Sequence, residues 1–148
     1  MADAPVTEYN SLAEVAKRLP NGTVCLLSAL VFHGITTQLP SEVWVALPRG
    51  SRTPRLDNRK LRVVRFAGRA LTEGRGEHRI EGVAVMIYSP AKTVADCFKF
   101  RNKIGLDVAL EGLRECIRQR KATIAEIRRF AAICRVGRVI QPYLESLP

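Results

Sequence analysis

The feature that most constrains the fold of this chain is a change in hydrophobic period. Residues 11–34 carry apolar side chains at helical spacing, residues 42–88 contain short β-branched runs, and the chain from Ser89 onward returns to helical spacing. A period near 3.6 residues indicates helices, whereas short β-branched runs indicate strands. The order predicts an α+β domain with N-terminal helices, a small mostly antiparallel sheet of about four strands, and a helical C-terminal half.

Two helices are predicted before the sheet. The first opens with Ser11 and Glu14 as a capping box. The second covers "TVCLLSALVFHG", with Thr23 as its cap and Gly34 as its end. Because nearly every position of this second helix is apolar, we expect it to be buried, with Ser28 hydrogen-bonded back to its own backbone.

The strands are predicted from "EVWVAL" (42–47), "LRVVRF" (61–66), "EHRI" and "VAVMIY". The last two runs flank Glu81-Gly82, which is typical of a two-residue hairpin turn. The sheet is therefore expected to be at least partly antiparallel.

The helical half is predicted to begin with a well-capped helix. Ser89 is the expected N-cap and Pro90 occupies the first helical position, where its missing N–H has no cost. Ala91, Val94 and Phe98 form the expected buried stripe of this helix. Further along, "TIAE" at residues 123–126 predicts a second capping box.

Length and charge bound the possible functions. With 148 residues, 47% of them hydrophobic, the chain is expected to form one domain, residues 1–148. The formal net charge of +10 favours a partner that carries phosphate or carboxylate groups, such as a nucleic acid or an acidic protein face. No run is long and apolar enough for a membrane span, and the N-terminus lacks the pattern of a signal peptide. We therefore expect a cytoplasmic protein with no membrane partner.

Enzymatic chemistry is not indicated by the sequence. It has no glycine-rich phosphate loop, and Gly50-Ser51 is not followed by the paired carboxylates that a nucleotidyltransferase needs for its metal. The only histidines, His33 and His78, fall on predicted secondary structure without other ligands around them. We expect no catalytic residue, no metal and no cofactor. The four cysteines lack C-x-x-C spacing and are interpreted as reduced thiols of the core.

Basic side chains are the remaining candidates for function. "PRGSRTPR" places three arginines in a loop after a buried strand, and "SPAKTVADCFKFRNKIG" carries further charges. Lys92 and Asp96 are four residues apart and are predicted to form a surface ion pair that points away from the buried stripe. The candidate binding residues are Arg49, Arg52, Arg55, Lys92, Asp96, Lys99, Arg101 and Lys103.

Several long runs of the sequence resemble a known family. These runs are "VCLLSALVFHGITTQLPSEVWVALPRG", "LRVVRF", "LTEG", "EHRIEGVAVMIYSPAKTVADCFKFRNKIGLDVALEGLRE" and "RQRKAT". They closely resemble the C-terminal domain of AbiEi-type antitoxins, the antitoxin half of type IV toxin–antitoxin and phage abortive-infection systems. The resemblance covers nearly the whole chain.

The resemblance implies a function but not a mechanism. In that family an N-terminal winged helix-turn-helix represses the operon, and the domain similar to this chain counters a nucleotidyltransferase-like toxin, without a stable complex. "MADAPVTEYNSLAEVAKRLP" resembles the segment that follows the wing, so the DNA-reading module is not carried over, and a truncated and a natural stand-alone form are both open. A kinase-like activity has been considered for some relatives, but the sequence contains no recognisable ATP loop to support it.

Two functions of different class follow from these observations. The first is a non-enzymatic antitoxin domain whose basic surface engages an acidic face of the toxin, or the RNA or nucleotide that the toxin acts on. The second is a general nucleic-acid-binding domain of a transcriptional regulator. Binding to random DNA or RNA with a steep salt dependence, and no effect on a toxin, would favour the second.

Overall fold

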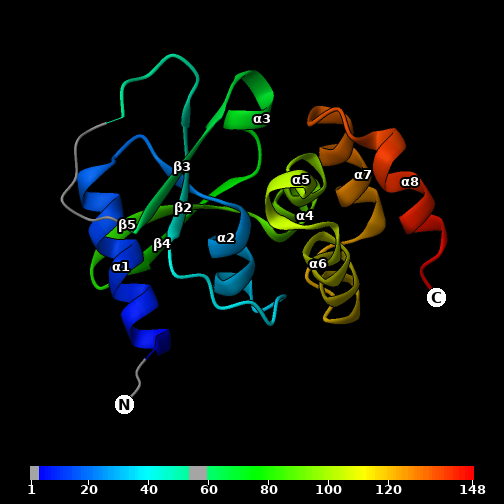
Figure 1. The fold of residues 1–148 in the computed structure, drawn as a ribbon, viewed down its shortest axis with the longest axis horizontal. Helices are drawn as coiled ribbons and strands as arrows, with labels where there is room; N and C mark the ends of the chain where they lie inside the picture. Colours follow the sequence, from blue (N-terminus) through cyan, green and yellow to red (C-terminus); the bar gives the residue numbers. More distant parts are fainter. Residues whose placement is uncertain (1–3, 54–59) are drawn as a thin grey trace.

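The computed structural model describes residues 4–53 and 60–148, with the backbone alone for residues 4–10. The protein has an α+β fold, and its described residues form a five-stranded mixed sheet and eight helices (Figure 1). The strands are β1 (Thr23–Val24), β2 (Val43–Pro48), β3 (Leu61–Phe66), β4 (Arg75–Ile80) and β5 (Val83–Tyr88). The helices are α1 (Ala4–Arg18), α2 (Leu26–His33), α3 (Gly68–Thr72), α4 (Pro90–Lys99), α5 (Arg101–Ile104), α6 (Leu106–Arg118), α7 (Ile124–Ile133) and α8 (Gly137–Glu145).

The sheet has the strand order β3-β2-β1-β5-β4. The hairpin β4–β5 is antiparallel and turns at Glu81-Gly82, as predicted. However, β2 pairs with β3 in parallel, and β1 pairs in parallel with β5 while remaining antiparallel to β2. The sheet is therefore mixed rather than mostly antiparallel. The β2–β3 connection, residues 49–60, has the length that a crossover between parallel neighbours requires.

The N-terminal elements differ from the sequence-based expectation in their starting points. Helix α1 begins at Ala4, so Ser11 lies inside it and does not cap it. Thr23 belongs to strand β1, and Cys25 takes the N-cap position of α2. A two-residue strand contains no alternation, so its neighbours in space rather than its own pattern define it. Gly34 ends α2 as predicted, in the left-handed conformation with φ 71°.

The two faces of the sheet are both covered, which explains the continuous apolar sequence of β2. Val43, Val45 and Leu47 pack in one cluster with the buried face of α1. Trp44 and Ala46, which alternate with them, pack in a second cluster with the helical half. Figure 1 shows α1 on the side of the sheet away from α6, α7 and α8. The buried hydroxyl of Ser28 accepts a hydrogen bond from the backbone N–H of Trp44 at 2.9 Å. It therefore links α2 to the sheet, contrary to the expectation that it would bond to the backbone of its own helix.

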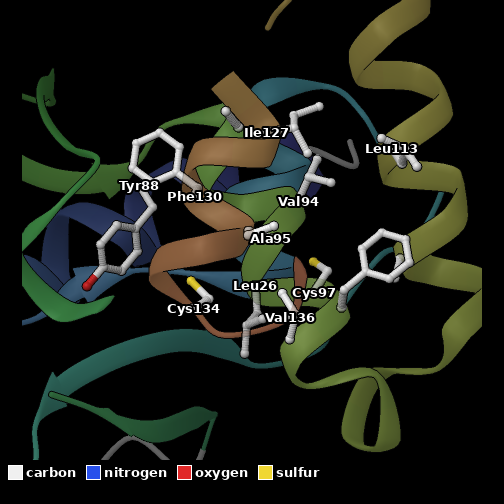
Figure 2. Close-up of a cluster of buried hydrophobic side chains, with 14 of the residues drawn as sticks. Leu26, Tyr88, Val94, Ala95, Cys97, Leu113, Ile127, Phe130, Cys134 and Val136 are labelled. Atoms are coloured by element: carbon white, nitrogen blue, oxygen red, sulfur yellow. The ribbon is translucent and has the colours of Figure 1, made fainter. Parts of the chain in front are cut away.

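Helix α4 lies at the centre of the molecule. It contacts α2, α5, α6, α7 and α8, and every residue from Ala91 to Phe98 is buried. Figure 2 shows Val94, Ala95 and Cys97 of this helix in the core cluster, with Val94 between Leu113 of α6 and Ile127 of α7 and with Cys97 near Val136. Its start is as predicted, since the hydroxyl of Ser89 accepts the backbone N–H of Lys92 and Pro90 is the first helical residue. The second predicted capping box, between Thr123 and Glu126, is also present.

Among the described helices, none has the length and apolar character needed to cross a bilayer.

Candidate anion-binding cleft

A cleft of about 740 Å³ lies between the sheet and the helical half. Its walls come from the ends of β2 and β3, from α3, from the C-terminal end of α4 and from the turn after α7. Among the described residues, five basic side chains and one carboxylate line it. The basic residues are Arg49, Arg65, Arg69, Lys99 and Arg135, and the carboxylate is Asp96.

The parallel pairing of β2 and β3 brings the first two arginines together. Leu47 pairs with Arg65, and the backbone N–H of Arg49 donates to the carbonyl of Phe66 at 2.8 Å. Both strands therefore end on the same side of the sheet. Arg49 is the residue after the end of β2, and Arg65 is the next-to-last residue of β3. The guanidinium of Arg65 also donates to the hydroxyls of Ser51 and Thr53, which ties the start of the connecting loop to β3.

The other basic residues come from elements far apart in the sequence. Arg69 lies on the short helix α3, Lys99 is the last residue of α4, and Arg135 follows the C-cap of α7. Arg69 contacts Glu73, with 3.9 Å between guanidinium Nε and carboxylate Oε2. The side chains of Arg49, Lys99 and Arg135 have no ion pair or hydrogen bond with any residue of 4–53 or 60–148. Three like charges thus line one cleft without an ion-pair partner among the described residues, and the charge of Lys99 also acts on the nearby Asp96 carboxylate, whose pKa it lowers.

The floor of the cleft contains the Lys92–Asp96 pair, whose position was predicted wrongly. The two side chains are 0% and 2% exposed, so they form a buried ion pair and not a surface one. Lys92 Nζ donates to both carboxylate oxygens of Asp96, at 2.9 Å and 2.7 Å. The i,i+4 spacing was interpreted correctly as a contact, but every residue from Ala91 to Phe98 is buried, so Lys92 and Asp96 have no solvent to face.

Aromatic rings and a glycine close the space around Lys92. Its Nζ lies 3.8 Å from the ring centroid of Tyr88 and 4.7 Å from that of Phe66, so the cation faces two π-systems. Gly74 covers the stem of Lys92 so closely that an added Cβ would lie 2.8 Å from Lys92 Cβ. Gly74 also has φ +84°, which favours glycine on conformational grounds. The side chain of Lys92 is therefore enclosed by the rings of Tyr88 and Phe66, by Gly74 and by the Asp96 carboxylate.

Burial dominates the electrostatics of the floor. It raises the pKa of Asp96 from 3.8 to about 6, and the nearby Lys92 ammonium opposes this rise. The thiol of Cys134, also on the cleft wall, donates to Asp96 Oδ1 at 3.3 Å. Burial first, and then the Asp96 charge, raise the pKa of Cys134 to about 12. This thiol is a hydrogen-bond donor and not a nucleophile at neutral pH.

The candidate residues named from the sequence divide into several groups. Arg49, Lys99 and Asp96 line the cleft, and Lys92 lies beneath Asp96. Arg52 is exposed and does not line the cleft, and Arg55 lies outside the described residues. Arg101 and Lys103 do not line it either.

Arg101 is only partly exposed, and its guanidinium donates to the carbonyl of Phe98 at 2.8 Å. It therefore caps the end of α4. Lys103 is exposed.

Sequence reasoning missed Arg65, Arg69 and Arg135 as members of the candidate site. Arg65 could have been found from the register of two parallel strands, because that register places it next to the end of β2. No such signal exists for Arg69, on the short helix α3, or for Arg135, in the turn between α7 and α8, since the place of each depends on tertiary packing.

The histidines and cysteines have structural positions. His33 Nε2 donates to the carbonyl of Tyr88 at 2.7 Å, and His33 and His78 both pack against the ring of Phe32. All four cysteines are free and buried, which confirms the prediction of core thiols. In the described part of the chain, no group of three or more His, Cys, Asp or Glu side chains is arranged to hold a metal ion.

Comparison with models of known protein families found no match to this chain, and a search of curated proteins found none either.

Proposed function

We propose that this protein is a non-enzymatic antitoxin domain of a type IV toxin–antitoxin system, acting against a nucleotidyltransferase-like toxin through its basic cleft. The observation that carries the proposal is the collection of five basic side chains around one concave surface, with three of them lacking a described counter-ion. The resemblance of long sequence runs to AbiEi-type antitoxins supports the biological role, and the cleft supports the surface through which it is exerted.

The chemistry of the cleft favours an anionic partner. Arginine side chains bind carboxylates and phosphates through paired N–H groups, and a concave basic surface concentrates the positive potential. An acidic face of the toxin, or the RNA or nucleotide on which the toxin acts, would both satisfy this requirement.

A growth-rescue assay tests this function. Cells expressing the toxin encoded beside this protein are grown with wild-type protein or with the cleft variant Arg49→Gln/Lys99→Gln/Arg135→Gln. These three side chains make no described hydrogen bond or ion pair, so the fold should remain intact, as a melting curve would show. Wild-type protein should restore growth, whereas the cleft variant should fail or rescue weakly.

The matched control removes the same charge elsewhere. Lys17, Arg114 and Lys121 are exposed and lie outside the cleft, so their triple replacement by glutamine also lowers the net charge by three. Rescue by this control together with failure of the cleft variant would support a local role of the cleft. Equal rescue by both folded variants would exclude the cleft as the antitoxin surface, and failure of wild-type protein would exclude the antitoxin function.

The second candidate is a general nucleic-acid-binding domain, which the net charge of +10 favours. It predicts weak, sequence-indifferent binding to duplex DNA that falls steeply with salt. In a mobility-shift titration, both triple variants should then lose affinity similarly, because each removes three charges from a diffuse contact. This outcome, combined with no growth rescue, would favour the second candidate.

A further inference from the structure

From the charge, volume and lining of the cleft we infer that it is a binding site for a free nucleoside polyphosphate, held by side chains instead of a glycine-rich loop. This inference uses the cleft of the proposed function but does not require antitoxin activity. Its evidence comes from three properties, which are the unbalanced charge, the neutralised floor and the presence of an aromatic wall.

The unbalanced charge calls for a ligand with several negative groups. Arg49, Lys99 and Arg135 converge on the cleft from three separate parts of the chain, and none of them makes an ion pair or hydrogen bond with a described side chain. Like charges around one concave surface repel each other, and a bound polyanion removes this repulsion. A single carboxylate or phosphate would leave most of these cations without a partner.

The floor of the cleft does not oppose an anion. Asp96 is the sole carboxylate among the described lining residues, and its oxygens accept hydrogen bonds from the buried Lys92 at 2.7 Å and 2.9 Å. While Asp96 is ionised, the positive charge of the buried Lys92 cancels its negative charge, so the pair has no net charge. Glu73, the other nearby acid, is shared between Arg69 and Arg129, with 3.0 Å between the Arg129 guanidinium and its carboxylate. The positive potential of the rim therefore remains available to a ligand.

The volume and the apolar part of the wall indicate more than an inorganic ion. A cleft of about 740 Å³ falls in the range of small-molecule sites. Phe100 lies on its wall and is partly exposed, and its ring stacks on that of Phe66 with centroids 5.5 Å apart and planes inclined by 20°. A partly exposed ring beside several cations suits a ligand that joins a planar base to a phosphate chain.

The absence of a phosphate-loop motif is consistent with this kind of site. Backbone cradles need closely spaced glycines, and this chain does not have them in the required spacing. Here the anion-binding groups are long side chains from four regions of the sequence, so no local motif records them. The structure assigns binding to this site and no reaction.

The test is calorimetric titration of the purified full chain at physiological salt with ATP, GTP, CTP and UTP in turn. At least one should bind with one-to-one stoichiometry and a dissociation constant below about 1 mM, with the corresponding monophosphate at least about tenfold weaker. Inorganic tripolyphosphate tests the base contact, since it should bind more weakly than the triphosphate nucleotide. The absence of saturable binding by all four nucleotides would overturn the inference.

Variants locate the site. Arg49→Gln/Lys99→Gln/Arg135→Gln should weaken nucleotide binding by about tenfold or more, whereas the control Lys17→Gln/Arg114→Gln/Lys121→Gln should change it by less than about twofold. Phe100→Leu should weaken the nucleotide but not tripolyphosphate. Equal losses in both triple variants would overturn the inference, because they would indicate non-specific charge attraction.

A nucleic-acid arm separates the two sources of phosphate. A single-stranded oligonucleotide that binds at the cleft while free nucleotides do not would overturn the inference in favour of a polymer backbone site. Failure of this inference is distinguishable from failure of the proposed function, because titration needs no toxin and growth rescue needs no added nucleotide. A cleft variant that loses nucleotide but still rescues cells would separate them directly.

Discussion

Helices α4 and α6 each contain an ion pair at helical spacing, and the two pairs differ in almost every physical respect. In α4, Lys92 and Asp96 are 0% and 2% exposed. In α6, Glu115 and Arg118 approach to 2.6 Å, but their side chains are 30% and 69% exposed. Burial raises the pKa of Asp96, whereas hydrogen bonds from Arg118 lower the pKa of Glu115 to about 2. Helical spacing, four residues in α4 and three in α6, thus yields a desolvated pair in one helix and a solvated pair in the other.

The difference comes from what surrounds each helix. Eight consecutive residues of α4 are buried, because five other helices contact it and sheet residues such as Trp44 pack in the same cluster. In contrast, α6 buries one face, made of Val108, Ala109, Gly112, Leu113 and Cys116. An amphipathic helix leaves its polar face to water, but a central helix does not. A polar residue in a central helix must find its partner within the protein.

The largest expected effect comes from removing the buried cation. Lys92→Met leaves the Asp96 carboxylate without its ion-pair partner, which should lower the free energy of unfolding by about 3–5 kcal/mol at pH 8. Urea unfolding followed by circular dichroism measures this. The control Lys92→Met/Asp96→Asn has no ionisable group left at the pair and should recover part of the loss. A loss below about 1 kcal/mol in the single variant would contradict the importance of burial.

The pH dependence of this variant sharpens the comparison. Asp96 already has a folded-state pKa of about 6, above its ordinary 3.8, so its contribution favours folding below about pH 4 and is lost as pH rises through 6. Without Lys92 the folded-state pKa should rise further. Lys92→Met should therefore be less destabilising at pH 5 than at pH 8, and the Met/Asn double variant should not show this trend. The midpoint for Asp96 itself can be measured by carbon NMR titration of the side-chain carboxyl, with about 6 expected for the wild-type protein.

The smallest effect is expected at the exposed pair. Glu115→Gln removes the charge that faces Arg118, but solvent and salt already compete for both groups. The melting temperature should agree with that of wild-type protein within experimental error, at low and at physiological salt. A clear loss of stability would mean that the hydrogen-bond chain from Glu115 through Gln119 to the carbonyl of Gly34 matters more than its exposure indicates.

The fold could be predicted where local chemistry decides it. Ser89 and Pro90 mark the start of α4, Glu81-Gly82 marks the hairpin, and each stands out in the sequence without reference to distant residues. The expected strands were runs of four to six residues, identified by β-branched side chains or by their place beside the Glu81-Gly82 turn. Strand β1 was missed because its two residues are defined by their pairing with β2 and β5.

The candidate site was harder to predict because its residues come from separate parts of the chain and meet only through tertiary packing. Lys92 and Asp96 were recognised as a contact, but their burial depends on the central place of α4, which no pattern within the helix records. Arg49 and Lys99 were named among many basic residues, and nothing local distinguished them from Arg52 or Lys103. Only the parallel register of β2 and β3, together with the packing of α3 and α7, brings the basic side chains around one cleft.

Strand β1 also sets the order in which the chain can fold. It is the link between the β2–β3 pair and the β4–β5 hairpin, and its residue Val24 must find Ile87, which lies in a much later part of the chain. Such a distant pairing requires a long loop to close before any contact energy is gained, so it slows folding. During synthesis, the sheet cannot be completed until Ile87 has left the ribosome. The helices after Ser89 have no such constraint, so we expect closure of the sheet around β1 to limit the folding rate.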